Sequence, residues 1–174
     1  NESVTMEVVL SNCDELWNWD YLSMNASITL SDIESHMELP WDRHYVNYNP
    51  NVTMTWIETH PYPRENWKWG CIGDCIKLTV DILAKYADKP WEFDNMSWFN
   101  PSITLELLLA TPRVPWNYKK MSSNPCLTID IVLALPDKDW DWRSVSRNGC
   151  ITMSDIESHM DLPWDWSCVS CNPS

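Results

Sequence analysis

The sequence predicts an all-α protein, an α-solenoid of about seven helix-turn-helix repeats of about 24 residues each. Two spacings support this fold. A Trp follows a Thr twelve residues later in six places, and one further pair is separated by fourteen residues. An Asn lies four residues before six of these seven Thr residues, and Cys75 takes that place once. Between Thr and Trp, apolar positions recur at helical intervals instead of alternating as in a strand.

The repeats begin near residues 1, 25, 49, 75, 100, 124 and 148, and an eighth begins at residue 172. The predicted domain organisation is therefore a single repeat array over residues 1–174. Neither end shows the atypical polar capping repeat that usually closes an array. We therefore expect a segment of a longer array, or an array that stacks end to end with other copies.

Each repeat is expected to open with a first helix that a Thr caps. In residues 25–48 this helix covers about 30–37, with Asp32 in the first turn, where an acidic side chain complements the helix dipole. Ile33 and Met37 form its apolar face. The predicted caps are Thr5, Thr29, Thr53, Thr79, Thr104, Thr128 and Thr152.

A second helix is expected to start at the Trp, because Pro precedes Trp in four repeats and suits a first helical turn. It covers about 41–48 in the second repeat, and the Asn that opens the next repeat ends it. Helices this short are marginal alone, so stacking must bury their apolar faces. The Trp residues predicted to form the repeat core are Trp17, Trp41, Trp67, Trp91, Trp116, Trp140 and Trp164.

One segment occurs almost unchanged twice, at residues 28–42 and 151–165. Its Asp32, Glu34 and His36 could be a metal cluster or an acid–base pair. The equivalent places in two other repeats hold Ile82, Ala84 and Tyr86, or Ile131, Leu133 and Leu135, and residues two apart on a helix point in different directions, so we interpret a solvated helix face. No nucleophile elbow or Ser/His/Asp pattern occurs. We expect no enzyme, no catalytic residue, no cofactor and no metal.

The cysteines and glycosylation sequons allow alternatives. Two pairs of cysteines have the spacing of metal ligands, namely Cys71 with Cys75 and Cys168 with Cys171. In a solenoid the first pair lies too far from the second pair for all four thiols to share one ion. Free thiols are the preferred interpretation, with a metal or a disulfide as the alternative. Sequons at Asn1, Asn25, Asn51 and Asn95 are interpreted as by-products of capping, with glycosylation as the alternative.

Charge restricts the partners. A formal net charge of −13 argues against binding to nucleic acid phosphates or to anionic lipid. No apolar run is long enough to span a membrane, and no signal-peptide pattern follows Asn1. Trp56 and Trp98 lie outside the main Trp register, so they are candidate exposed contacts for a partner.

The stretches "NPSITLELLLATPRVPWNYKKMSSNP" (100–125) and "CITMSDIESHMDLPWDWSCVSCNP" (150–173) carry a resemblance. They resemble the Trp-rich "PWDW" tandem repeats of giant amoeba-infecting viruses of the Mimivirus type. The chain departs from this pattern at "ENWKWGCIGDC" (65–75), which lacks the Pro and the Asn. That family has no established activity, so the resemblance implies a virion or infected-cell location and transfers no functional residue.

The sequence thus predicts a structural or protein–protein interaction scaffold, viral and self-assembling end to end, whose partner is a protein or further copies of itself. The alternative is a monomeric binding module that contacts a protein or a glycan through exposed aromatic side chains.

Overall fold

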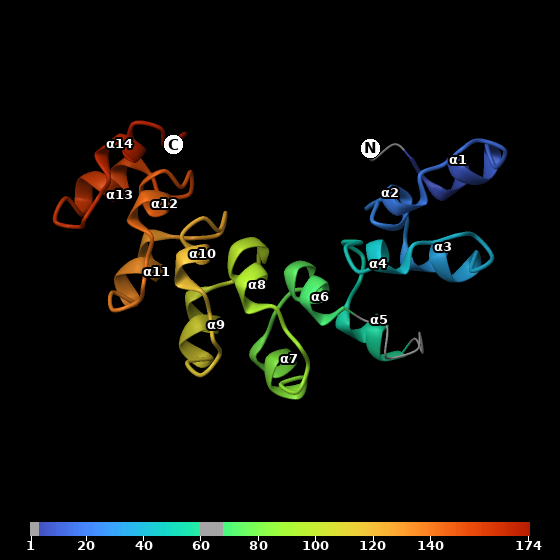
Figure 1. The fold of residues 1–174 in the computed structure, drawn as a ribbon, viewed down its shortest axis with the longest axis horizontal. Helices are drawn as coiled ribbons and strands as arrows, with labels where there is room; N and C mark the ends of the chain where they lie inside the picture. The colour runs from blue at the N-terminus through green and yellow to red at the C-terminus, as the bar shows by residue number, and fades with distance from the viewer. Residues whose placement is uncertain (1–3, 60–67) are drawn as a thin grey trace. The chain divides into compact units, whose positions relative to one another are not determined.

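The computed structural model describes residues 4–59 and 68–174, and these residues form fourteen short helices and no strand (Figure 1). The predicted all-α fold is confirmed. Where the sequence predicted one array, contacts divide the chain into two compact units, Asn1–Ile76 and Lys77–Ser174, and the division falls near the start of the fourth repeat.

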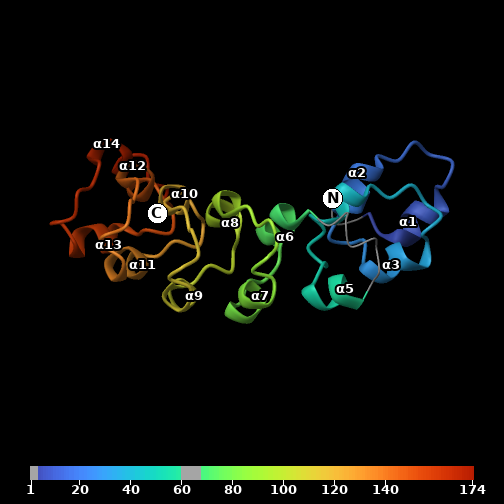
Figure 2. The same cartoon turned by 60° about the horizontal axis from the view of Figure 1, so that its bottom comes forward.

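Each complete repeat in the described part contributes two helices, the first odd-numbered and the second even-numbered. The helices of the N-terminal unit are α1 (Met6–Ser11), α2 (Trp19–Ser23), α3 (Leu30–Ser35), α4 (Arg43–Val46), α5 (Met54–Thr59) and α6 (Trp69–Cys75). The helices of the C-terminal unit are α7 (Val80–Lys85), α8 (Phe93–Phe99), α9 (Leu105–Ala110), α10 (Tyr118–Met121), α11 (Ile129–Ala134), α12 (Trp142–Ser146), α13 (Met153–Ser158) and α14 (Trp166–Val169). Within the C-terminal unit, odd-numbered helices form one row and even-numbered helices another (Figure 2).

The second helix does not begin where the sequence predicted. In the second repeat it starts at Arg43, two residues after Trp41, and Asp42 is its N-cap, accepting the His44 and Tyr45 N–H groups. The Trp41 indole N–H instead donates to the His36 carbonyl at 2.8 Å. The Trp41 indole therefore satisfies the backbone carbonyl of His36 at the end of the first helix. The next residue, Asp42, caps the second helix.

The first helix is also shorter than predicted, since α3 ends at Ser35 and His36 is its C-cap. Five Thr side chains accept a first-turn N–H, and four of them are Thr29, Thr79, Thr104 and Thr152. Thr53 Oγ1 also accepts, from the Trp56 N–H. Thr5 and Thr128 occupy the N-cap position without a side-chain bond. At Thr128 the reason is visible, because its backbone carbonyl accepts the Ile131 N–H.

The core consists mainly of three aliphatic columns, and the first helix supplies one of them, which is buried at Val9, Ile33, Ile57, Leu83, Leu108, Val132 and Ile156. The residue before the capping Thr is at most 5 % exposed at Ile28, Val52, Leu78, Ile103, Leu127 and Ile151. The apolar residue of the second helix is buried at Leu22, Val46, Ile72, Met96, Met121, Val145 and Val169. Of the predicted core Trp residues, Trp116, Trp140 and Trp164 are buried, Trp17, Trp41 and Trp91 are half-buried, and Trp67 lies outside the described residues. The Trp rings thus border an aliphatic core.

Candidate functional site

The Asn residues that open the repeats form hydrogen bonds from one repeat to the previous one. Asn124 donates its side-chain amide to the carbonyls of Ser97 (3.0 Å) and Asn100 (3.1 Å), and its Oδ1 accepts the Cys126 N–H at 2.7 Å. Equivalent amide-to-carbonyl bonds are made by Asn49, Asn148 and Asn172. We call these four residues the ladder asparagines. Because Asn124 is 1 % exposed, it satisfies carbonyls that water cannot reach.

A serine makes a second bond across the junction. The Ser122 hydroxyl accepts the backbone N–H of Asp141 at 2.9 Å and donates to the Tyr118 carbonyl. The same acceptor role is played by Ser23 toward Asp42, by Ser97 toward Asn117 and by Ser146 toward Asp165. We call this the serine bridge. At these four junctions it fixes the N-cap residue of the second helix against the preceding repeat.

Aromatic rings make the third junction contact. The second residue after the Trp in one repeat meets the Trp of the next repeat edge to face, with ring centroids 5.0–5.6 Å apart. The pairs are Trp19–Trp41, Phe93–Trp116, Tyr118–Trp140 and Trp142–Trp164. Such pairs contribute about 0.5–1.5 kcal/mol beyond the area that they bury. A junction is therefore defined by a ring pair, a serine bridge and a ladder asparagine.

The last described repeat presents one side of such a junction. Trp166 holds the same place as Trp142, and it is 54 % exposed. Ser170, in the place of the bridging serines, is exposed, and its hydroxyl donates to the Ser167 carbonyl. No described residue covers the Trp166 ring in the way that Trp164 covers Trp142. This surface, made by Trp166 and Ser170, is called the open face.

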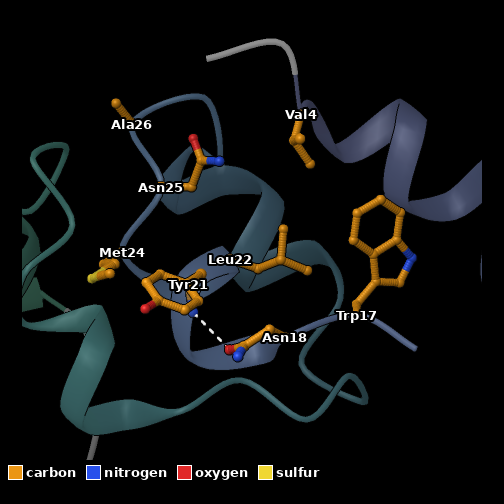
Figure 3. A pocket seen from close by; sticks show the side chains of 8 residues that line it. All are labelled: Val4, Trp17, Asn18, Tyr21, Leu22, Met24, Asn25 and Ala26. Atoms are coloured by element: carbon orange, nitrogen blue, oxygen red, sulfur yellow. Dashed lines mark hydrogen bonds between the residues drawn. The ribbon is translucent and has the colours of Figure 1, made fainter. Parts of the chain in front are cut away.

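The first repeat presents the opposite side. A pocket of about 450 Å³ lies between α2 and the segment that leads into α1 (Figure 3). Figure 3 shows Leu22 between Trp17 and Tyr21, with Val4 across from Asn18. Val4 is half-buried, although the equivalent residues of the six other repeats are at most 5 % exposed. Trp41, the equivalent of Trp17 in the second repeat, meets Trp19 of the first, so the pocket lies on the side of α2 that corresponds to this ring contact.

The two predicted partner contacts differ. Trp56 is only 7 % exposed and its indole N–H donates to Glu34 Oε1, so the expectation of an exposed side chain is wrong there. It faces the preceding repeat from α5. Trp98 is 38 % exposed, stacks on Phe99 with centroids 4.7 Å apart, and lies under the Lys120 ammonium at 4.5 Å.

The duplicated segment forms caps. Asp32 and Asp155 each complete a capping box with the preceding Thr, and His36 and His159 each bond through Nδ1 to a backbone carbonyl. Their carboxylates and imidazoles make local helix-end bonds. Within residues 4–59 and 68–174, no group of three or more His, Cys, Asp or Glu side chains is placed to hold a metal ion.

All seven cysteines lie in the described part, where they are free thiols. Burial raises the pKa of the Cys75 thiol to about 11. Tyr48 Oη lies 2.9 Å from Cys71 Sγ, and this hydrogen bond, together with burial, raises the pKa of Tyr48 well above its ordinary value. Among the sequons, Asn51 donates to the Ala26 and Ile28 carbonyls and Asn95 to Glu92. Asn25 accepts the Ser27 N–H, and Asn1 lies outside the described residues.

Sequence reasoning missed both polar junction bonds. The signal was present, because Ser recurs six residues after the Trp at residues 23, 97, 122, 146 and 170. The Asn was interpreted as a helix end, a role that it has at Asn100, the C-cap of α8. Elsewhere the second helix stops earlier, as at Val46, and the buried amide serves the neighbouring repeat.

Comparison with known proteins gives no relative, since no protein-family model, no curated protein and no solved structure matches the chain. The resemblance to viral Trp-rich repeats therefore stays a prediction. No helix in the described part is long and apolar enough to cross a membrane.

Proposed function

We propose that this protein is a structural, protein–protein interaction scaffold, viral in origin, that grows by adding further repeats end to end. One observation carries the proposal. At four junctions, the aromatic ring two residues after the Trp of one repeat is in edge-to-face contact with the Trp of the next repeat. Trp166 holds the same place in the last described repeat and is 54 % exposed. An exposed aromatic ring beside a serine hydroxyl that donates only within its own repeat is the surface that another repeat of this type would bury.

The free energy gained by burying Trp166 favours the binding of a further repeat over leaving the ring exposed to water. Burying an exposed large aromatic contributes about 1.5–3 kcal/mol, and aromatic anchors of this kind dominate many protein interfaces. The partner need not be basic, because the internal junctions use rings, hydroxyls and amides. The formal net charge of −13 instead opposes assembly of identical chains at low salt. Added salt should therefore strengthen assembly, in contrast to an interface held by opposite charges.

Sedimentation velocity of the purified chain, with light scattering, tests the scaffold. We expect the average mass to rise between micromolar and hundreds of micromolar protein, and to rise further with sodium chloride. A mass that stays at that of one chain throughout this range would refute end-to-end growth.

The second candidate, a monomeric binding module, is favoured by Trp98. Its ring and that of Phe99 are stacked, exposed by 38 % and 53 %, and Lys120 lies over the indole. An exposed aromatic pair beside a cation could stack on a sugar ring or anchor a peptide. Glycan-array binding that is lost in Trp98→Ala and kept in Trp166→Ala would support this alternative, and binding insensitive to Trp98 would reject it.

A further inference from the structure

One ladder asparagine differs from the others in the residue that follows it. Asn49, Asn124 and Asn172 each precede a proline. Asn148 instead precedes Gly149. The side-chain amide of an asparagine can react with the backbone nitrogen of the next residue, because the two groups are held close enough to close a five-membered imide ring. Proline has no N–H to lose, so its nitrogen cannot complete this reaction, and among the ladder asparagines only Asn148 can form the imide.

The position of Gly149 leaves the attacking nitrogen accessible. The residue is exposed, and it has no side chain to shield its N–H. Asn148–Gly149 is the single Asn-Gly step of the sequence, so no other asparagine has the same neighbour. The bonds of Asn148 belong to the junction of the fifth and sixth repeats, so neither end of the chain takes part in them.

The folded junction holds the Asn148 side chain away from this reaction. Its amide donates to the carbonyls of Ser122 at 3.1 Å and Asn124 at 3.0 Å, and its Oδ1 accepts the Cys150 N–H at 3.0 Å. The Asn148 residue is 8 % exposed, so the junction also keeps water from the side chain. Attack by the Gly149 nitrogen requires the amide to rotate, and this rotation breaks the three bonds. The reaction therefore needs the junction to open.

We infer that Asn148 is a self-modification site, which reacts when this junction opens. The Gly149 nitrogen attacks Asn148 Cγ and forms a bond to it, the Cγ–Nδ2 bond breaks, and the amide group leaves as ammonia with the proton of the Gly149 N–H. Water then adds to one of the two imide carbonyls and opens the ring, which gives aspartate or isoaspartate. The inference goes beyond the proposed scaffold, since it concerns a junction within one chain.

Neither product can restore the junction. Each replaces an amide donor with a carboxylate, which accepts hydrogen bonds and donates none. The carbonyls of Ser122 and Asn124 lose their buried donor and face a negative charge. Isoaspartate also adds a methylene group to the main chain, which shifts the residues that follow. An opening that was reversible thereby becomes permanent, and the chain keeps a chemical record of it.

Mass spectrometry of the unchanged full chain tests the site. The chain is incubated in mildly alkaline buffer with and without guanidinium chloride, in water labelled with heavy oxygen, which marks the carboxyl that imide opening creates. Digestion with pepsin in acid then limits further reaction. In guanidinium chloride we expect Asn148 to convert while Asn124, which precedes Pro125, does not. Conversion of both asparagines at the same rate would refute the assigned chemistry.

The folded chain tests the control by the junction. Asn148 should convert at least about 100-fold more slowly without denaturant, because each of its three hydrogen bonds shifts the opening equilibrium by about fivefold. Ser122→Ala removes the hydroxyl that accepts the Asp141 N–H in the same junction, so it should speed conversion by about fivefold. Ser123→Ala, one residue away, is the matched control and should change the rate by less than about twofold. Equal rates in these two variants would show that the junction does not control the reaction.

Two further variants separate the reaction from its consequence. Gly149→Pro supplies the residue that follows the other ladder asparagines, so residue 148 should not convert even in guanidinium chloride. Gly149 has no positive φ, and a Cβ there would lie 2.9 Å from Pro173 Cγ, so a small shift of that ring accommodates the change. Asn148→Asp reproduces one product, and hydrogen exchange near α10 and α12 should become at least about tenfold faster. Exchange as slow as in the unchanged chain would overturn the one-way effect on the junction.

Discussion

Replacing one ladder asparagine should destabilise the repeat stack far more than an ordinary polar substitution. Asn124 is 1 % exposed and makes three bonds, to the carbonyls of Ser97 and Asn100 and from the Cys126 N–H. At about 1–1.5 kcal/mol for each bond, Asn124→Ala should lower the free energy of unfolding by about 3–5 kcal/mol. The carbonyls that lose their donor stay buried, which places the expected value toward the upper end.

Urea unfolding followed by Trp fluorescence measures this loss, and hydrogen exchange localises it. The matched control is Asn12→Ala, because Asn12 is exposed and donates one local bond to the Val8 carbonyl. We expect the control to cost less than about 1 kcal/mol. Faster exchange in Asn124→Ala should concentrate on the segments on both sides of the junction, near α8 and α10. Equal midpoints for the two variants would show that the ladder does not hold the repeats together.

Asn124→Asp sharpens the same test through pH. The substitution keeps an acceptor for the Cys126 N–H but points an acceptor at two carbonyl oxygens. Burial and these oxygens raise the pKa of the new carboxyl above its unfolded value of about 3.9. The folded state then binds the proton more tightly, so this variant should gain stability relative to the unchanged chain as pH falls toward that value. A constant difference between the two proteins from pH 7 to about pH 4 would contradict this electrostatic account.

Three further results are expected. Ser122→Ala should lower the free energy of unfolding by about 1–3 kcal/mol because Asp141 N–H loses its buried acceptor, while Ser123→Ala, one residue away and half-buried, should cost less in the same urea titration. Trp164→Phe should keep the ring contact with Trp142 but lose the indole bond to the His159 carbonyl, so the free energy of unfolding should fall by about 1 kcal/mol. If this variant lost as much stability as Trp164→Ala, the edge-to-face role of the ring would be contradicted. Alkylation at pH 8 followed by mass spectrometry should modify the exposed Cys150 before Cys75, whose pKa of about 11 leaves little thiolate, and the reverse order would refute the assigned burial.

The sequence predicted the features that depend on local chemistry. Thr29 and Thr152 cap their helices as expected, because a Thr followed by Asp three residues later satisfies the first-turn N–H groups with no help from other repeats. Of the two positions that helical spacing assigned to the apolar face of the first helix, Ile33 is buried, whereas the prediction is wrong for Met37, which is 50 % exposed because α3 ends at Ser35. Placing the start of the second helix failed at Trp41, because Pro before Trp suggested a helix start. The Asp42 side chain and the indole bond to His36 together start the helix later.

The junctions were harder to predict because their partners lie about one repeat apart. An Asn near a helix end has a sufficient local explanation, so nothing in one repeat indicates that its amide reaches the Ser97 carbonyl, 27 residues earlier. Trp56 shows the same limit. Its place outside the Trp register suggested an exposed side chain, whereas the preceding repeat supplies Glu34 as its acceptor and buries the ring. Whether a side chain in a stacked repeat is exposed depends on the residues of the adjacent repeat, and the spacing of residues within one repeat does not reveal these.

The duplicated segments show why function should be sought at the junction instead of within a repeat. Both copies form the same capping box and the same indole bond to a His carbonyl. Glu34 accepts from Trp56 of the following repeat, whereas its equivalent, Glu157, is exposed. Identical sequence thus acquires different contacts according to what stacks on it. A further repeat that covers the open face would also contact Glu157, as the third repeat contacts Glu34. Trp166 and Glu157 should therefore become protected from chemical labelling together upon assembly.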